Sequence, residues 1–164
     1  MGVSDVPSDW LNEVGVLTRR EIEARIIGPL VDRLAAEFGA DRVHGIVRDA
    51  IVDLAREQGV ALAEQVGSTS LTAFAAALGA WSRDGALETE VTALDDDVFA
   101  FDVHRCRYAE MYRALGLEDL GATLSCNRDA ALIEGFNPDI ELTRTQTIMQ
   151  GATHCDFVFR ARPA

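Results

Sequence analysis

The sequence predicts an α+β fold, in which a helical N-terminal half precedes a four-stranded antiparallel sheet (ββ-helices-ββ) covered by helices. Two changes of pattern predict this class. From Thr18 to about Arg83 apolar residues recur every three or four positions, whereas after Gly85 they alternate with polar residues, as in strands. With 164 residues, the chain is expected to be a single domain with a helical portion over 1–85 and an α+β portion over 86–164.

Three helical segments are expected in the first half. The first starts at a capping box of Thr18 and Glu21 and ends at Gly39, the second runs from a cap at Asp41 to Gly59, and the third covers 61–81 with an interruption near 67–69. An apolar stripe marks the first helix and comprises Ile22, Ile26, Ile27, Leu30, Leu34 and Phe38. The sequence leaves open whether this stripe is buried within the chain, in a homo-oligomer through the N-terminal helices, or by a different chain.

Two hairpins are expected in the second half. The first has strands over 87–91 and 99–103 joined by a turn at the acidic triplet 95–97, and the second has strands over 140–149 and 154–161. Between the hairpins, short helices over 108–115 and 127–134 are joined by a helical turn over 117–124.

Strand alternation separates core residues from candidate binding residues. Cys155 shares the apolar face of the last strand with Phe157 and Phe159, so we interpret it as a core residue. Arg105 and Arg144 each continue an inward-facing apolar row, and an arginine on such a face needs an acceptor. That acceptor is either a carboxylate of this acidic chain or the carboxylate of a ligand held bidentately, and the sequence leaves both open.

Cys126 stands immediately before Asn127, the expected cap of the next helix. At a helix N-terminus a thiol has a lowered pKa and a larger thiolate fraction, which suits a nucleophile. Asp129 falls in the first turn, where it could orient a water or a proton donor. The alternative is a small buried cysteine followed by an ordinary acidic residue of a helix start.

Glu110 lies on the helix that starts near Tyr108, three residues from both Arg107 and Arg113. The ordinary interpretation is an exposed ion-pair cluster. The alternative is a general acid or base that points into a cavity between helix and sheet.

Composition excludes several function classes. All fifteen basic residues are arginines, so the chain has no lysine for Schiff-base chemistry, pyridoxal phosphate attachment or a P-loop. The net charge of −12 opposes binding to nucleic acid or to anionic membranes, and no apolar run approaches the length of a membrane span.

Cysteine and histidine positions argue against disulfides and metal. Three cysteines in a chain without a recognisable export signal indicate reduced thiols and a cytoplasmic location. His154 and Cys155 are adjacent on a strand and face opposite ways, and the chain contains no CxxC or HExxH motif. We expect neither a metal nor another cofactor.

The C-terminal half carries a recognisable block. The stretch RCRYAEMYRALGLEDLGATLSCNRDAALIEGFNP, followed by LTRTQTIMQGATHCDF, resembles the L-2-amino-thiazoline-4-carboxylic acid hydrolase family over about 102–159. The shared features are the Glu110 helix, the Cys126-x-x-Asp129 step, the Arg144-x-x-Thr147 segment and the ending Gly151-x-x-x-Cys155-Asp156-Phe157. The resemblance implies hydrolytic opening of a C–N bond in a small cyclic amidine that bears a carboxylate, with a carbamoyl-cysteine type product.

This resemblance and the residue chemistry together predict the site. We expect Cys126, Asp129 and Glu110 to be catalytic, and the substrate to be bound by Arg144, Thr147, Arg105 and Cys155. The expected partner is a small-molecule carboxylate substrate. The alternative function is a small-molecule-binding or accessory module that has no catalysis of its own.

Overall fold

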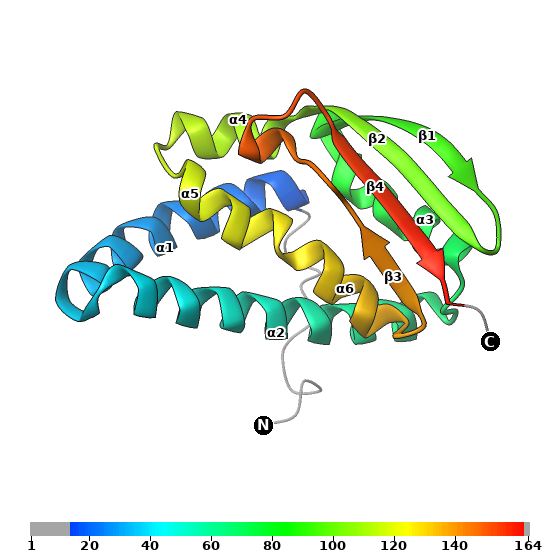
Figure 1. Ribbon diagram of the computed structural model, residues 1–164, viewed down its shortest axis with the longest axis horizontal. Helices are drawn as coiled ribbons and strands as arrows, with labels where there is room; N and C mark the ends of the chain where they lie inside the picture. Colours follow the sequence, from blue (N-terminus) through cyan, green and yellow to red (C-terminus); the bar gives the residue numbers. More distant parts are fainter. Residues whose placement is uncertain (1–13, 163–164) are drawn as a thin grey trace.

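The computed structural model describes residues 14–162 and confirms the α+β class. Two long helices come first and a four-stranded antiparallel sheet follows, with short helices inserted between its two halves (Figure 1). The helices are α1 (Val16–Phe38), α2 (Ala40–Val66), α3 (Leu71–Ala77), α4 (Arg107–Ala114), α5 (Glu118–Gly121) and α6 (Arg128–Phe136). Segments η3 (Leu78–Gly85) and η5 (Ile148–Gln150) are 3₁₀-helical, and η4 (Ala122–Cys126) is π-helical.

The strands are β1 (Leu87–Leu94), β2 (Val98–Cys106), β3 (Ile140–Thr143) and β4 (Cys155–Ala161). They are ordered β1-β2-β4-β3, and each neighbouring pair is antiparallel. The predicted first hairpin is confirmed, and the carboxylate of Asp95 closes its turn by accepting from the backbone N–H of Asp97 and Val98 at 2.9 and 2.7 Å.

The two long helices form an antiparallel hairpin whose ends differ in part from the expectation. Helix α1 ends at Gly39 as predicted, because this glycine adopts φ 91°, which favours a residue without a side chain. The predicted capping box is wrong: α1 begins at Val16 after Gly15, and no side chain caps it. The predicted cap at Asp41 is also wrong, since Gly39 precedes α2 and Asp41 lies in its first turn.

Gly59 does not end a helix, contrary to the prediction. Helix α2 continues through Gly59 to Val66 and ends at Gly67, within the interruption expected near 67–69. A Cβ on Gly59 would lie 2.1 Å from the backbone oxygen of Leu132, and a Cβ on Gly135 would lie 2.0 Å from that of Arg56. The two glycines therefore allow α2 and the C-terminal half of α6 to pack backbone against backbone, which fixes α6 against α2.

The third strand is shorter than predicted. It ends at Thr143, because the backbone N–H groups of Thr145 and Gln146 donate to the carboxylate of Asp156 at 3.0 and 2.9 Å. These side-chain bonds replace the strand ladder and turn the chain away from the sheet. Arg144 therefore lies just beyond β3 rather than on it.

The core lies on one face of the sheet. Phe99, Phe101, Phe157 and Phe159 stack there, and Phe74 and Phe136 cover them from α3 and α6. Cys155 shares this face and is buried, as predicted.

Helix α1 contacts the rest of the molecule through small residues. Ala24, Gly28 and Val31 are buried, whereas the apolar stripe leaves Ile26 66% and Leu30 53% exposed. Within residues 14–162, Ile27 packs against the core, whereas the other stripe residues are exposed: Ile22, Ile26, Leu30, Leu34 and Phe38. None of the helices in this range combines the length and the apolar character required to cross a bilayer.

Candidate functional site

A cavity of about 370 Å³ lies between the core face of the sheet and the surrounding helices. Its walls come from α1, α2, α4, η4, α6, the sheet and the segment after β3, so segments distant in sequence meet there. The charged side chains lining it are Arg19, Arg20, Arg128, Arg144 and Asp129, and the apolar ones include Trp81, Val103, Leu132 and Phe157. Such a volume suits a small-molecule ligand.

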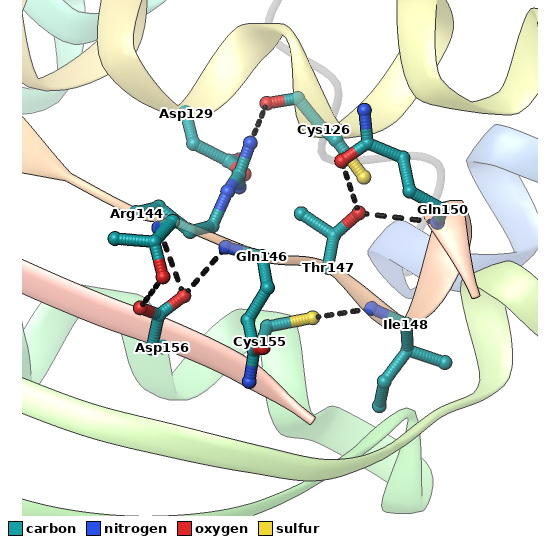
Figure 2. A network of polar contacts seen from close by, with 10 residues as sticks. Cys126, Asp129, Arg144, Gln146, Thr147, Ile148, Gln150, Cys155 and Asp156 are labelled. Carbon is teal, nitrogen blue, oxygen red and sulfur yellow. Dashed lines mark hydrogen bonds and ion pairs between the residues drawn. The ribbon is translucent and has the colours of Figure 1, made fainter. Parts of the chain in front are cut away.

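Arg144 and Asp129 form an ion pair at the wall of this cavity. Both side chains are largely buried, with 16% and 15% exposure, and Arg144 Nη1 donates to Asp129 Oδ2. Arg144 Nη2 also donates to the carbonyl oxygen of Cys126 at 3.0 Å, and its guanidinium lies 4.9 Å from the ring centre of Phe157. Figure 2 shows the guanidinium between the carboxylate and the carbonyl. The acceptors of Arg144 in this structure are therefore internal.

Burial dominates the electrostatics of Asp129. Desolvation raises its pKa to about 6, against the opposing effect of the Arg144 guanidinium, which favours the carboxylate. A carboxyl group with a pKa near neutrality exchanges a proton readily at physiological pH. This property suits a general acid or base.

Cys126 lines the cavity, but its helix does not start where the sequence predicted. The chain passes from η4 into α6 without a break, and Asn127 has helical dihedrals and no side-chain capping bond. The Asn127 N–H donates to the carbonyl of Ala122 at 2.9 Å, so no free helix N-terminus faces the thiol.

The expected lowering of the Cys126 pKa is consequently wrong. Burial, reinforced by the negative charge of Asp129, raises the pKa of this thiol to about 12. Burial also raises the pKa values of Cys106 and Cys155, which line the same cavity. All three cysteines are reduced in the structure.

The structure does not bring Glu110 or Arg105 to the cavity. Arg105 Nε donates to Glu110 Oε1 at 2.8 Å, and the two side chains are 51% and 48% exposed. The inward orientation predicted for Arg105 is wrong, because the β1–β2 register shifts between Glu88 and Thr89 and interrupts the alternation next to it. The hydrogen bond from Arg105 lowers the pKa of Glu110, which is the opposite of what a general acid needs.

Thr147 and Cys155 stabilise the segment that carries Arg144. Thr147 is buried, and its hydroxyl oxygen accepts from the backbone N–H of Gln150 at 3.2 Å, capping η5 (Figure 2). The Sγ atom of Cys155 accepts from the backbone N–H of Ile148 at 3.2 Å. Cys155 lines the cavity, whereas Thr147 does not.

Sequence reasoning missed two buried arginines. Arg20 on α1 is 9% exposed and Arg128 on α6 is 6% exposed, and both line the cavity. Arg20 precedes Ala24 and Gly28 at helical four-residue spacing, so the small-residue face of α1 was the signal that could have found it. The large residues of the exposed stripe obscured that signal.

Metal-ligating side chains do not cluster in the described part of the chain. Within residues 14–162, no three His, Cys, Asp or Glu side chains come together as a metal site requires. His104 instead lies 3.3 Å from Glu90, and His154 contacts Gln146.

Fold and site together define an α+β protein that encloses an arginine-lined, ligand-sized cavity between its sheet and its helices. A match to the L-2-amino-thiazoline-4-carboxylic acid hydrolase family spans residues 19–159. The chain therefore belongs to this family. No curated protein is significantly similar to it in sequence.

Solved structures share the fold, among them the two described here. The phenol-responsive sensory domain of the transcription activator PoxR, with phenol, has 13% identity and a TM-score of 0.54, over 83% of this chain and 73% of that domain. Subunit 3 of the trafficking protein particle complex from Naegleria fowleri, covalently bound to palmitic acid, has 10% identity and a TM-score of 0.53, over 89% of this chain and 96% of that subunit. At these identities the likeness establishes the fold alone.

Proposed function

We propose that this protein is a cytoplasmic hydrolase that opens a C–N bond in a small carboxylated cyclic amidine such as 2-aminothiazoline-4-carboxylate. Membership of the family supports the reaction class. The observation that carries the proposal is the convergence of Cys126, Asp129 and Arg144, from two separate parts of the family block, on one cavity.

In this proposal Asp129 activates water. The water oxygen bonds to the amidine carbon while the carboxylate takes one proton, which the carboxyl group gives to the ring nitrogen as the C=N double bond becomes single. The proton of the new hydroxyl group then passes through the same carboxylate to the ring nitrogen, as the C–N bond breaks and the C=O bond forms. The raised pKa of Asp129 suits both transfers. Arg144 is then a positioning residue, because its donors hold the carboxylate and the backbone at Cys126.

A thiolate mechanism has less support. With a pKa of about 12, Cys126 is a neutral thiol at physiological pH, and no histidine lines the cavity to take its proton. We propose that the thiol helps to shape the cavity wall. Thr147 and Cys155 have a structural role as well, because each accepts a backbone hydrogen bond from the segment that follows Arg144.

Turnover tests the proposal. Purified protein, treated with a chelator and incubated with 2-aminothiazoline-4-carboxylate and related carboxylated cyclic amidines, should convert at least one of them to the ring-opened carbamoyl product. A folded protein that leaves the whole panel intact would contradict the proposal. Activity that appears only after zinc is added would contradict the water mechanism.

The second candidate is a ligand-binding module without chemistry. The largely apolar walls of the cavity favour it, together with the fold shared with a phenol-responsive sensory domain. Saturable binding of the same compounds without any conversion would support this second function.

A further inference from the structure

Arg128 differs from the other buried arginines in its acceptor. It lies in the first turn of α6, is 6% exposed and lines the cavity. Its Nη2 donates to the side-chain oxygen of Gln58 on α2, a neutral group. Within residues 14–162 Arg128 forms no ion pair, although a guanidinium has five N–H donors.

The two carboxylates that attract Arg128, Glu23 and Asp129, are each hydrogen-bonded to a different arginine. Arg144 is paired with Asp129, and Arg20 donates to Glu23 at 2.5 Å. Desolvation, followed by the repulsion from Arg20, lowers the pKa of Arg128 to about 10, and the attraction of Glu23 and Asp129 only partly opposes this shift. A buried cation whose nearest carboxylates are bound to other arginines is stabilised by an anion that binds beside it.

Building on the proposed function, we infer that Arg128, with Arg20 beside it, binds the carboxylate of the ligand in this cavity. A carboxylate there receives charge-assisted hydrogen bonds from a planar guanidinium and supplies the missing negative charge. This assignment moves the carboxylate site from Arg144, whose guanidinium is already paired with the Asp129 carboxylate, to Arg128, the residue that directly precedes Asp129.

The position also suits the proposed chemistry. Arg128 and Asp129 are consecutive on α6 and both line the cavity, so a ligand anchored at Arg128 carries its ring close to the Asp129 carboxyl group. The apolar walls formed by Trp81, Leu132 and Phe157 then contact the ring rather than the carboxylate. We expect the cavity to select small, ring-bearing monocarboxylates.

Calorimetric titration of the wild-type protein tests the inference without a mutation. The probes are 2-aminothiazole-4-carboxylate, an aromatic analogue whose ring does not open, and its carboxamide, which has nearly the same shape but no charge. Loss of the charged contact should weaken binding of the carboxamide roughly 10- to 100-fold. Equal affinities for the two probes would overturn the inference.

Variants then locate the contact. Arg128→Gln should lose the preference for the carboxylate, Arg128→Lys should retain part of it, and the exposed Arg160→Gln is the matched control that should retain all of it. A folded Arg128→Gln protein that still prefers the carboxylate as strongly as wild type would overturn the inference. Should Arg128→Gln fail to fold, the Lys variant decides: carboxylate affinity identical to wild type would contradict a bidentate contact.

The outcome is separable from the proposed function. Preferential carboxylate binding through Arg128 without ring opening would leave this inference standing and contradict the hydrolase. Ring opening whose rate and KM are the same in wild type and in the Arg128 variants would support the hydrolase and contradict this inference.

Discussion

Two residues of the family block, Asp129 and Cys126, have opposite chemical characters in this structure although both lie at the cavity. Burial raises both pKa values, but from different starting points. The pKa of the carboxyl group shifts towards 7, so this group can exchange a proton at neutral pH. The pKa of the thiol shifts further above 7, so the thiol stays protonated and is a poor nucleophile. The same physical effect therefore favours Asp129 as the acid–base group.

We predict that Cys126→Ser retains most of the turnover and folds normally. A hydroxyl occupies nearly the same space as the thiol, and neither group is ionised at neutral pH with these surroundings. Steady-state kinetics with thermal melts as a folding control measure this. A loss of several orders of magnitude in a folded protein would indicate nucleophilic catalysis by the thiol instead.

We also predict that Asp129 makes folding less favourable as the pH rises. Its pKa is about 6 in the folded protein and 3.8 in its reference state, so the folded state binds this proton more tightly. The contribution to stability is present in full below pH 3.8 and is lost as the pH rises through 6. The unfolding free energy of wild type minus that of Asp129→Asn should therefore decrease from pH 4 to pH 7, as measured by urea titration. A difference that rises over this range would contradict the assigned shift.

At the scale of elements, the contact between α2 and α6 positions the helix that carries Arg128 and Asp129. Gly59→Ala should destabilise the protein by roughly 1–3 kcal/mol or more, because the new methyl group would lie 2.1 Å from the backbone oxygen of Leu132. Gly79→Ala is the matched control, since a Cβ there meets nothing within 4 Å and the effect should stay below ~1 kcal/mol. Urea unfolding compares the two. Equal effects would show that α2 and α6 do not require the close approach.

The exposed stripe of α1 fits a second copy of this chain, and we propose that it forms a two-fold interface. The stripe is self-complementary: antiparallel pairing of two α1 helices centred at Gly28 places Ile22 opposite Leu34 and Ile26 opposite Leu30. The same pairing places Glu23 opposite Arg33, so opposite charges flank the apolar contact.

We predict a dimer in sedimentation experiments that Ile26→Glu converts to a monomer. Val91→Glu, a similar change at an exposed apolar residue of β1, should remain dimeric. A monomeric wild-type protein would contradict the proposal and would favour a different protein as the partner of the stripe.

At the scale of the whole molecule, local patterns could predict the elements but not their contacts. Period and turn residues predicted α1, the first hairpin and the inward face with Cys155, whereas α2 was divided in two at Gly59. Gly59 was misinterpreted, because the sequence does not distinguish a glycine that ends a helix from one that admits another helix. The end of β3 depends on the Asp156 carboxylate, which is eleven residues from Thr145 in sequence.

The candidate site could be predicted only in part, for the same reason. The expected helix start predicted Cys126 and Asp129, strand alternation predicted Arg144, and the family resemblance joined the three in one site. The ion pair of Asp129 with Arg144 and the pKa values of Cys126 and Asp129 depend on burial by distant helices. Arg20 comes from α1, more than one hundred residues before Arg128, so only the fold reveals that they line the same cavity.

We propose that the cavity performs hydrolysis through Asp129. The most direct test of this proposal is single-turnover conversion of 2-aminothiazoline-4-carboxylate, followed by NMR with protein in excess, for wild type and for Asp129→Asn. We predict that the wild-type protein opens the ring and that the folded variant lowers the rate by at least 100-fold. Equal rates for the two proteins, or a bound ring that stays intact in the wild type, would contradict the account.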